Sequence, residues 1–181
     1  AKFDPESKTL TLDNATISTS VIKFPGLENS IKGLTIRLIG DNTITSENYW
    51  GLFNNTERSI TFTGSGKLTV NGSTTAPQTG YRRAIFNWGT IVVDGCTLEA
   101  NGGVYGIGSG FWKFVNCNVR TKGGGGSQSD EYAGSLTWMW DKEPEFVGCK
   151  ITSPAGVSWK KFQNNGYDNY VLVGEDGNAV T

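Results

Sequence analysis

The chain has 181 residues, of which 36% are hydrophobic, and it carries 16 basic and 17 acidic side chains. This length and apolar content suffice for one folded domain with a core and exclude a disordered chain. The net charge of −1 gives no sign of the basic surface that nucleic acids or anionic membranes attract, and the apolar runs are too short to cross a bilayer. We therefore expect no nucleic-acid partner and no membrane span.

A short pattern of apolar, polar, small and again apolar residues recurs six times along the chain. Successive copies begin 26, 24, 31, 21 and 32 residues apart, a period typical of solenoids. The copies occupy residues 12–17, 38–44, 62–68, 93–98, 114–119 and 146–151.

Each copy lies among residues that alternate apolar and polar, which predicts strands with one buried face. The second half of each repeat has its own marker, an aromatic residue followed by an apolar strand, at 49–53, 81–86, 105–107, 132–136 and 159–162. Residues 159–165 could instead form one helical turn. Three short strands per repeat favour a single-stranded right-handed parallel β-helix of about six to seven coils over a β-sandwich or jelly roll.

Equivalent positions of the six copies should stack inside such a solenoid as ladders of similar side chains. The ladder of small residues would hold Ala15, Asn42, Gly66, Cys96, Cys117 and Cys149. The two apolar ladders beside it would hold Leu12, Leu38, Phe62, Val93, Phe114 and Phe146, and Ile17, Ile44, Leu68, Leu98, Val119 and Ile151. For the cysteines, a reduced buried ladder is favoured over a metal site or a disulfide with one free thiol, because close C-x₂-C pairs are absent.

Residues 1–181 are expected to form one domain, a fragment or C-terminal module of a longer secreted protein, since the chain opens at Ala1 without an initiator Met or a signal peptide. The longer repeats should carry loops at 71–80 and 122–131, which are either a binding face or plain linkers.

Chemistry is sparse in this sequence. Histidine is absent, which removes the commonest general base and metal ligand, so we expect no catalytic residue, no metal and no cofactor. The best acidic cluster is Asp141, Glu143 and Glu145, for which a solvated turn is the simpler interpretation. Asp130 and Glu131 are adjacent and would point to opposite sides of a strand.

Aromatic residues are the stronger candidates, with six Trp and six Tyr. Flat ring faces bind sugars by apolar contact. The alternative is that Tyr49, Tyr81, Tyr105, Tyr132 and Trp159 simply stack on one another at a turn. The candidate carbohydrate-binding residues are Trp50, Trp88, Trp112, Trp138, Trp140, Tyr81 and Arg82.

Several segments also resemble a known group of proteins. The stretches SKTLTLDNATI, IKGLTIRLIGDNTITS, GSGKLTVNG, VDGCTLEANGGVYGIGSG and FVGCKITSPAG are similar to secreted gut-bacterial surface proteins with a right-handed parallel β-helix of the pectate-lyase-like kind. The resemblance implies a secreted or cell-surface location and an adhesin-like or carbohydrate-binding role. The acidic pairs, His-Gly and basic tripeptide of the catalytic members are missing here, so catalysis is not implied.

These observations together predict a monomeric, non-catalytic extracellular module that binds a polysaccharide or a host or bacterial surface glycan. Two alternatives remain open. One is a polysaccharide lyase or hydrolase with an atypical site, and the other is a structural adhesin or spacer with no small ligand.

Overall fold

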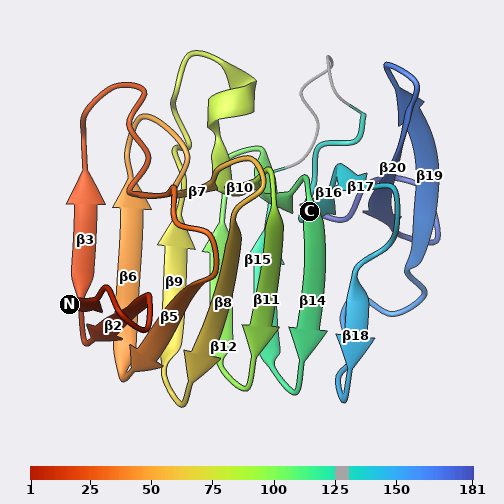
Figure 1. Ribbon diagram of the computed structural model, residues 1–181. Helices are drawn as coiled ribbons and strands as arrows, with labels where there is room; N and C mark the ends of the chain where they lie inside the picture. The colour runs from red at the N-terminus through yellow and green to blue at the C-terminus, as the bar shows by residue number, and fades with distance from the viewer. Residues whose placement is uncertain (125–130) are drawn as a thin grey trace.

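The computed structural model describes residues 1–124 and 131–181 and is all-β, with four sheets (Figure 1). Within these residues the helical structure is a short 3₁₀ turn, η1 (Thr79–Tyr81). The largest sheet, sheet A, has the strand order β1-β2-β5-β8-β11-β14-β18. Its strands are β1 (Lys2–Asp4), β2 (Thr9–Asp13), β5 (Leu34–Ile39), β8 (Ser59–Gly64), β11 (Thr90–Asp94), β14 (Phe111–Val115) and β18 (Glu145–Val147).

Two five-stranded parallel sheets complete the main body. Sheet B contains β3 (Thr16–Thr19), β6 (Asp41–Ser46), β9 (Lys67–Asn71), β12 (Thr97–Asn101) and β15 (Asn118–Lys122). Sheet C contains β4 (Leu27–Asn29), β7 (Leu52–Asn54), β10 (Arg83–Asn87), β13 (Tyr105–Gly108) and β16 (Leu136–Thr137). From β2 to β16 the chain enters sheets A, B and C in turn, so equivalent strands of successive repeats lie side by side.

The prediction of a single right-handed parallel β-helix of six to seven coils along the whole chain is wrong, and with it the description of the chain as a pectate-lyase-like solenoid. The arrangement is a mixed one of several sheets. Strand β1 runs antiparallel to β2, and a fourth, fully antiparallel sheet joins β17 (Met139–Trp140), β20 (Tyr167–Val173) and β19 (Ser158–Asn164). Residues 159–165, a candidate helical turn, lie mainly in β19.

The antiparallel pairing of β19 with β20 is caused by the turn between them, which the repeat pattern does not reveal. Asn165 and Gly166 have φ values of 51° and 82° and connect β19 to β20. Two successive residues with positive φ form the tight turn that joins antiparallel strands. Alternation of apolar and polar residues shows that a segment is a strand, but it does not show which strand it pairs with.

The predicted ladders slip by two residues between the second and third repeats. Leu38 pairs with Gly64 rather than with Phe62, and Ile44 pairs with Val70 rather than with Leu68. A slip of two keeps every side chain on its own face, so the core is unaffected. Glycine permits it, because a Cβ at Gly64 would lie 2.4 Å from the Leu38 carbonyl oxygen.

The core lies between sheets A, B and C and consists of inward-facing aliphatic and aromatic side chains. Phe62, in the central strand of sheet A, is fully buried beside Ile36 and Val93. An asparagine ladder that the sequence analysis missed runs along one margin of sheet C. Asn29 donates to the Oδ1 of Asn54 at 2.8 Å, and Asn54 donates to the Oδ1 of Asn87 at 2.8 Å.

Candidate functional site

The outer face of sheet C is the main aromatic surface of the molecule. Leu52 and Ile85 are register partners that point into the core and are fully buried. Because side chains alternate along a strand, their neighbours Phe53 and Phe86, also register partners, point outward. The parallel register therefore brings aromatic rings from successive repeats together on this face.

We call this surface the aromatic band. Trp50 lies at its centre, with its ring centroid 4.9 Å from that of Phe53 and 4.5 Å from that of Phe86. Trp88 packs edge-on against Phe86 at 5.2 Å. The members of the band are Tyr49, Trp50, Phe53, Tyr81, Phe86 and Trp88.

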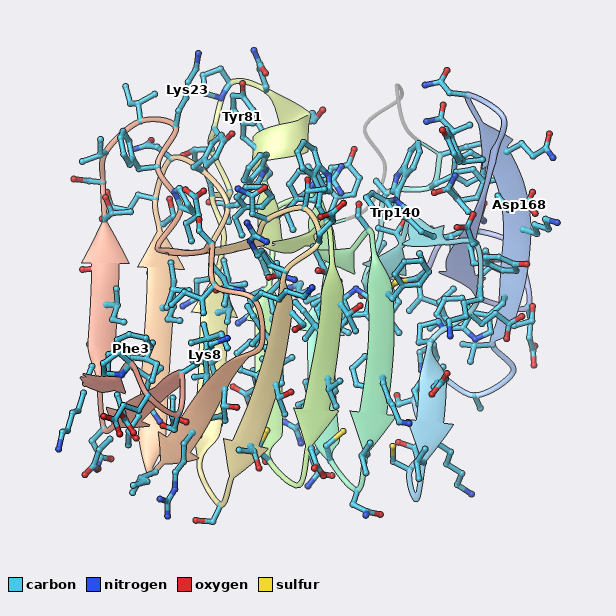
Figure 2. The ribbon with its side chains drawn as sticks, viewed as in Figure 1. Phe3, Lys8, Lys23, Tyr81, Trp140 and Asp168 are labelled. Carbon is cyan, nitrogen blue, oxygen red and sulfur yellow. The ribbon has the colours of Figure 1, made fainter. Side chains whose placement is uncertain are left out.

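The rings of the band differ in accessibility. Phe53 is only 8% exposed and forms its floor, whereas Trp88 is 39% exposed. The indole Nε1 of Trp50 donates to the carbonyl oxygen of Gly80 at 2.8 Å, which fixes that ring against the loop carrying Tyr81. Tyr81 lies at the upper margin of the molecule in Figure 2. Because Trp88 has the largest exposed fraction in the band, its ring is the most accessible to a ligand.

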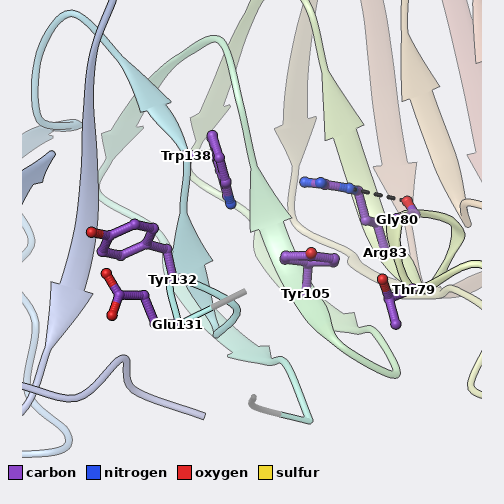
Figure 3. A pocket seen from close by; sticks show the side chains of 7 residues that line it. All are labelled: Thr79, Gly80, Arg83, Tyr105, Glu131, Tyr132 and Trp138. Atoms are coloured by element: carbon purple, nitrogen blue, oxygen red, sulfur yellow. Dashed lines mark hydrogen bonds between the residues drawn. The ribbon is translucent and has the colours of Figure 1, made fainter. Parts of the chain in front are cut away.

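A pocket of about 480 Å³ adjoins the band (Figure 3). It opens between the loop that follows β9 and the segment before β16. The residues that line it are Thr79, Gly80, Arg83, Tyr105, Glu131, Tyr132 and Trp138.

Arg83 connects the pocket to the aromatic band. Its guanidinium carbon lies 3.9 Å from the ring centroid of Tyr105 and 4.8 Å from that of Phe86. Its Nε also donates to the Gly80 carbonyl oxygen at 3.2 Å (Figure 3). A guanidinium held between two rings is attracted to their faces and keeps a fixed position.

The opposite wall of the pocket is also aromatic. Tyr132 stacks on Phe162 with a centroid distance of 3.8 Å and an interplanar angle of 11°. Trp138 meets Phe162 edge-on at 5.0 Å. Strand β19, which carries Phe162, thus supports this wall from behind.

The structure separates the seven candidate residues into groups. Trp50, Trp88 and Tyr81 belong to the aromatic band, and Trp138 lines the pocket. The remaining three lie elsewhere: Trp112 is 3% exposed in the core, Trp140 is half-buried in β17, and Arg82 donates through Nε to the Ala76 carbonyl oxygen at 2.7 Å.

The alternative of a single stack of tyrosines is realised only in part. Tyr49 and Tyr81 are in contact at 4.6 Å. Tyr105 instead packs against Arg83, Tyr132 against Phe162, and Trp159 against the core.

The acidic candidates do not converge. Glu145 is paired with Lys142 at 3.1 Å and Lys113 at 3.2 Å, and the hydrogen bonds from these two lysines hold the pKa of its carboxyl below the usual value. Among the described residues no group of three or more Cys, Asp or Glu is placed to hold a metal ion. Asp130 lies outside the described residues. Of the described residues that line the pocket, Glu131 is the single carboxylate.

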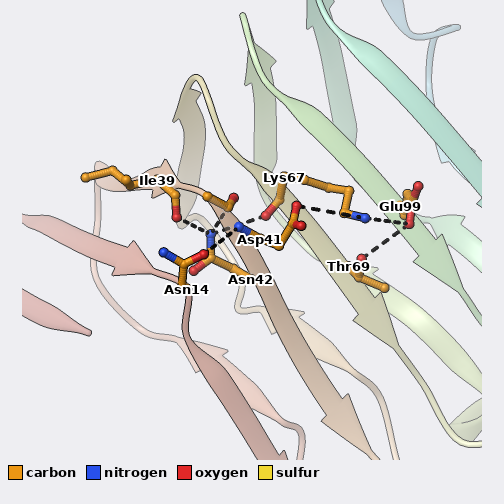
Figure 4. A network of polar contacts seen from close by, with 8 residues as sticks. Asn14, Ile39, Asp41, Asn42, Lys67, Thr69 and Glu99 are labelled. Atoms are coloured by element: carbon orange, nitrogen blue, oxygen red, sulfur yellow. Dashed lines mark hydrogen bonds and ion pairs between the residues drawn. The ribbon is translucent and has the colours of Figure 1, made fainter.

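The outer surface of sheet B is polar by comparison (Figure 4). Lys67 lies 4.0 Å from a carboxylate oxygen of Asp41 and 3.8 Å from one of Glu99, and Thr69 donates to Glu99 at 3.3 Å. Nearby, the side chain of Asn42 accepts from the Ala15 amide at 2.9 Å and closes the turn between sheets A and B. This face resembles an ordinary solvated surface, so sheet C remains the better candidate.

No protein family, curated protein or solved structure matches the chain. Within the described residues, no helix has the length and apolar character needed to cross a membrane.

Proposed function

We propose that the protein is a non-catalytic module that binds carbohydrate on the outer face of sheet C. The observation that supports this most is the continuity of aromatic side chains across that face. They run from the aromatic band through Arg83 to the pocket walls at Tyr105 and Trp138.

Sugar rings present an apolar C–H face and a polar hydroxyl edge, and both have counterparts here. Ring faces such as that of Trp88 suit the apolar side. The Arg83 guanidinium, the Glu131 carboxylate and the Thr79 hydroxyl line the adjoining pocket and can hydrogen-bond to hydroxyl groups. The expected ligands are polysaccharides or surface glycans.

The residues that line the pocket favour carbohydrate binding without cleavage. Glycoside hydrolysis normally requires two carboxyl groups on either side of the scissile bond. Glu131 alone among the described lining residues supplies one. The proposal includes a secreted or cell-surface location, which rests on the resemblance of the repeat segments to secreted surface proteins.

A glycan array followed by titration calorimetry on the best ligand tests the proposal. Trp88→Ala and Trp138→Ala should each weaken binding by about fivefold or more, because an aromatic anchor typically contributes more than about 1 kcal/mol. Tyr167→Ala is the matched control, since Tyr167 is an aromatic residue that is 70% exposed at the start of β20. The affinity of the Tyr167→Ala variant for the ligand should equal that of the wild type.

Other outcomes distinguish the alternatives. Binding that survives both tryptophan substitutions would place the ligand elsewhere. Degraded polysaccharide in the same incubations would support the lyase or hydrolase. An array with no ligand would favour the spacer.

A further inference from the structure

The three cysteines occupy the same turn in three successive repeats, directly after strands of sheet A. The residues before them are Gly95, Asn116 and Gly148, and all three have positive φ values of 67°, 44° and 65°. The turns therefore share one backbone conformation, and the three side chains leave it in the same direction.

The register places neighbouring turns in direct contact. Val115 pairs with Val147, and the amide of Asn116 donates to the Val147 carbonyl oxygen at 2.9 Å. A Cβ at Gly148 would lie 1.9 Å from the Asn116 Oδ1. Adjacent strands are about 4.8 Å apart, which falls within the Cα separation of about 4.4–6.8 Å that a disulfide spans.

Accessibility separates one pair from the third cysteine. Cys96 is 4% exposed, whereas Cys117 and Cys149 are half-buried. Both of the latter line a cleft of about 920 Å³ at the end of sheet B. An external reagent can therefore reach this pair and not Cys96.

The chain after Cys149 is also less constrained than its equivalents. Residues 97–101 and 118–122 form strands β12 and β15, whereas residues 150–157 belong to no strand. Cys149 makes a hydrogen bond from Sγ to the Phe114 carbonyl oxygen at 3.4 Å. With no strand following it, Cys149 can move the few tenths of an ångström that bring two Cβ atoms to disulfide distance.

We propose that Cys117 and Cys149 form a reversible disulfide when the protein meets a small-molecule disulfide, and that Cys96 stays reduced. The thiolate of Cys149 attacks one sulfur of the external disulfide and releases its other half as a thiol. Cys117, as thiolate, then attacks the sulfur of Cys149 and releases the second half. The protein loses two electrons and two protons, and the external disulfide is reduced to two thiols.

Burial determines how the reaction depends on pH. Burial and the neighbouring Cys149 thiol raise the pKa of Cys117 to about 12, and burial raises that of Cys96 to about 11. A raised pKa lowers the fraction of thiolate at neutral pH, and the thiolate is the reactive form. Because the thiolate fraction of Cys117 grows with pH, closure of the disulfide should become faster as the pH rises.

Peptide mapping of the native protein after incubation with oxidised glutathione tests the proposal. Trypsin places the three cysteines in different peptides, 84–113, 114–120 and 143–150. The expected product is a cross-link between 114–120 and 143–150, with Cys96 recovered alkylated. Dithiothreitol should reduce this cross-link, and the melting temperature of the oxidised protein should be about 5–10 °C higher than that of the reduced protein.

Single substitutions supply the controls. Cys96→Ser should leave the cross-link intact, and Cys149→Ser should abolish it. A cross-link that includes peptide 84–113, or an uncross-linked native protein under conditions that oxidise the urea-unfolded chain, would overturn the proposal.

Discussion

Phe62→Ala should lower the free energy of unfolding by about 3–5 kcal/mol, the usual cost of removing a buried aromatic ring. Phe62 is fully buried in β8, and its register partners Ile36 and Val93 are equally buried on either side. These partners lie in parallel strands whose spacing is fixed by backbone hydrogen bonds, so they cannot collapse into the cavity. Urea denaturation followed by circular dichroism measures the change.

Thr61→Ala is the matched control in the same strand. Thr61 directly precedes Phe62 in β8 and faces away from the core. Its substitution should cost less than about 1 kcal/mol. Similar losses from both substitutions would mean that the inward and outward faces of sheet A have been exchanged.

Asn54→Ala should destabilise the fold by about 3 kcal/mol, because several buried hydrogen bonds end on one side chain. Asn54 is fully buried and accepts from Asn29 at 2.8 Å. Its Nδ2 donates to the Asn87 Oδ1 at 2.8 Å and to the Arg58 carbonyl oxygen at 3.1 Å. Alanine removes all three bonds, although Asn29 Nδ2 still donates to the Ile31 carbonyl oxygen and Asn87 Oδ1 still accepts from the Gly89 amide. Thermal unfolding monitored by calorimetry records the loss.

The exposed Asn118 in β15 provides the comparison for the asparagine ladder. Asn118→Ala should be nearly neutral. A loss of less than about 1 kcal/mol at Asn54 would show that the ladder is a consequence of the fold rather than a support for it.

The sequence predicted the positions of most strands better than their arrangement. Alternation around Leu34–Ile39 and Ser59–Gly64 is a local signal, and both segments are strands. The pairing of strands depends on the turns between them, and the conformation of a turn is harder to predict from the sequence. The slip that pairs Leu38 with Gly64 depends on Gly64 and Gly66, which both pack against the backbone of Leu38. The antiparallel hairpin depends on Asn165 and Gly166.

For the candidate site, the composition indicated that aromatic residues would form it, but it did not indicate which of them lie on the surface. Trp112 lies within β14 and is in the core, whereas Trp88 directly follows β10 and is exposed. The alternation of inward and outward side chains along a strand is the signal that could have identified Phe53 and Phe86 as outward-facing. Arg82 precedes β10 and donates to the Ala76 carbonyl oxygen, whereas Arg83 begins β10 and lines the pocket.

The measurement that tests carbohydrate binding on sheet C most directly is a ¹H–¹⁵N correlation spectrum of the six tryptophan indole groups during titration with the best array ligand. Each indole signal can be assigned by substitution of one tryptophan at a time. The account predicts that the signals of Trp88 and Trp138 shift with ligand concentration, while the core residue Trp112 does not respond. Unchanged signals for Trp88 and Trp138 at saturating ligand would contradict it.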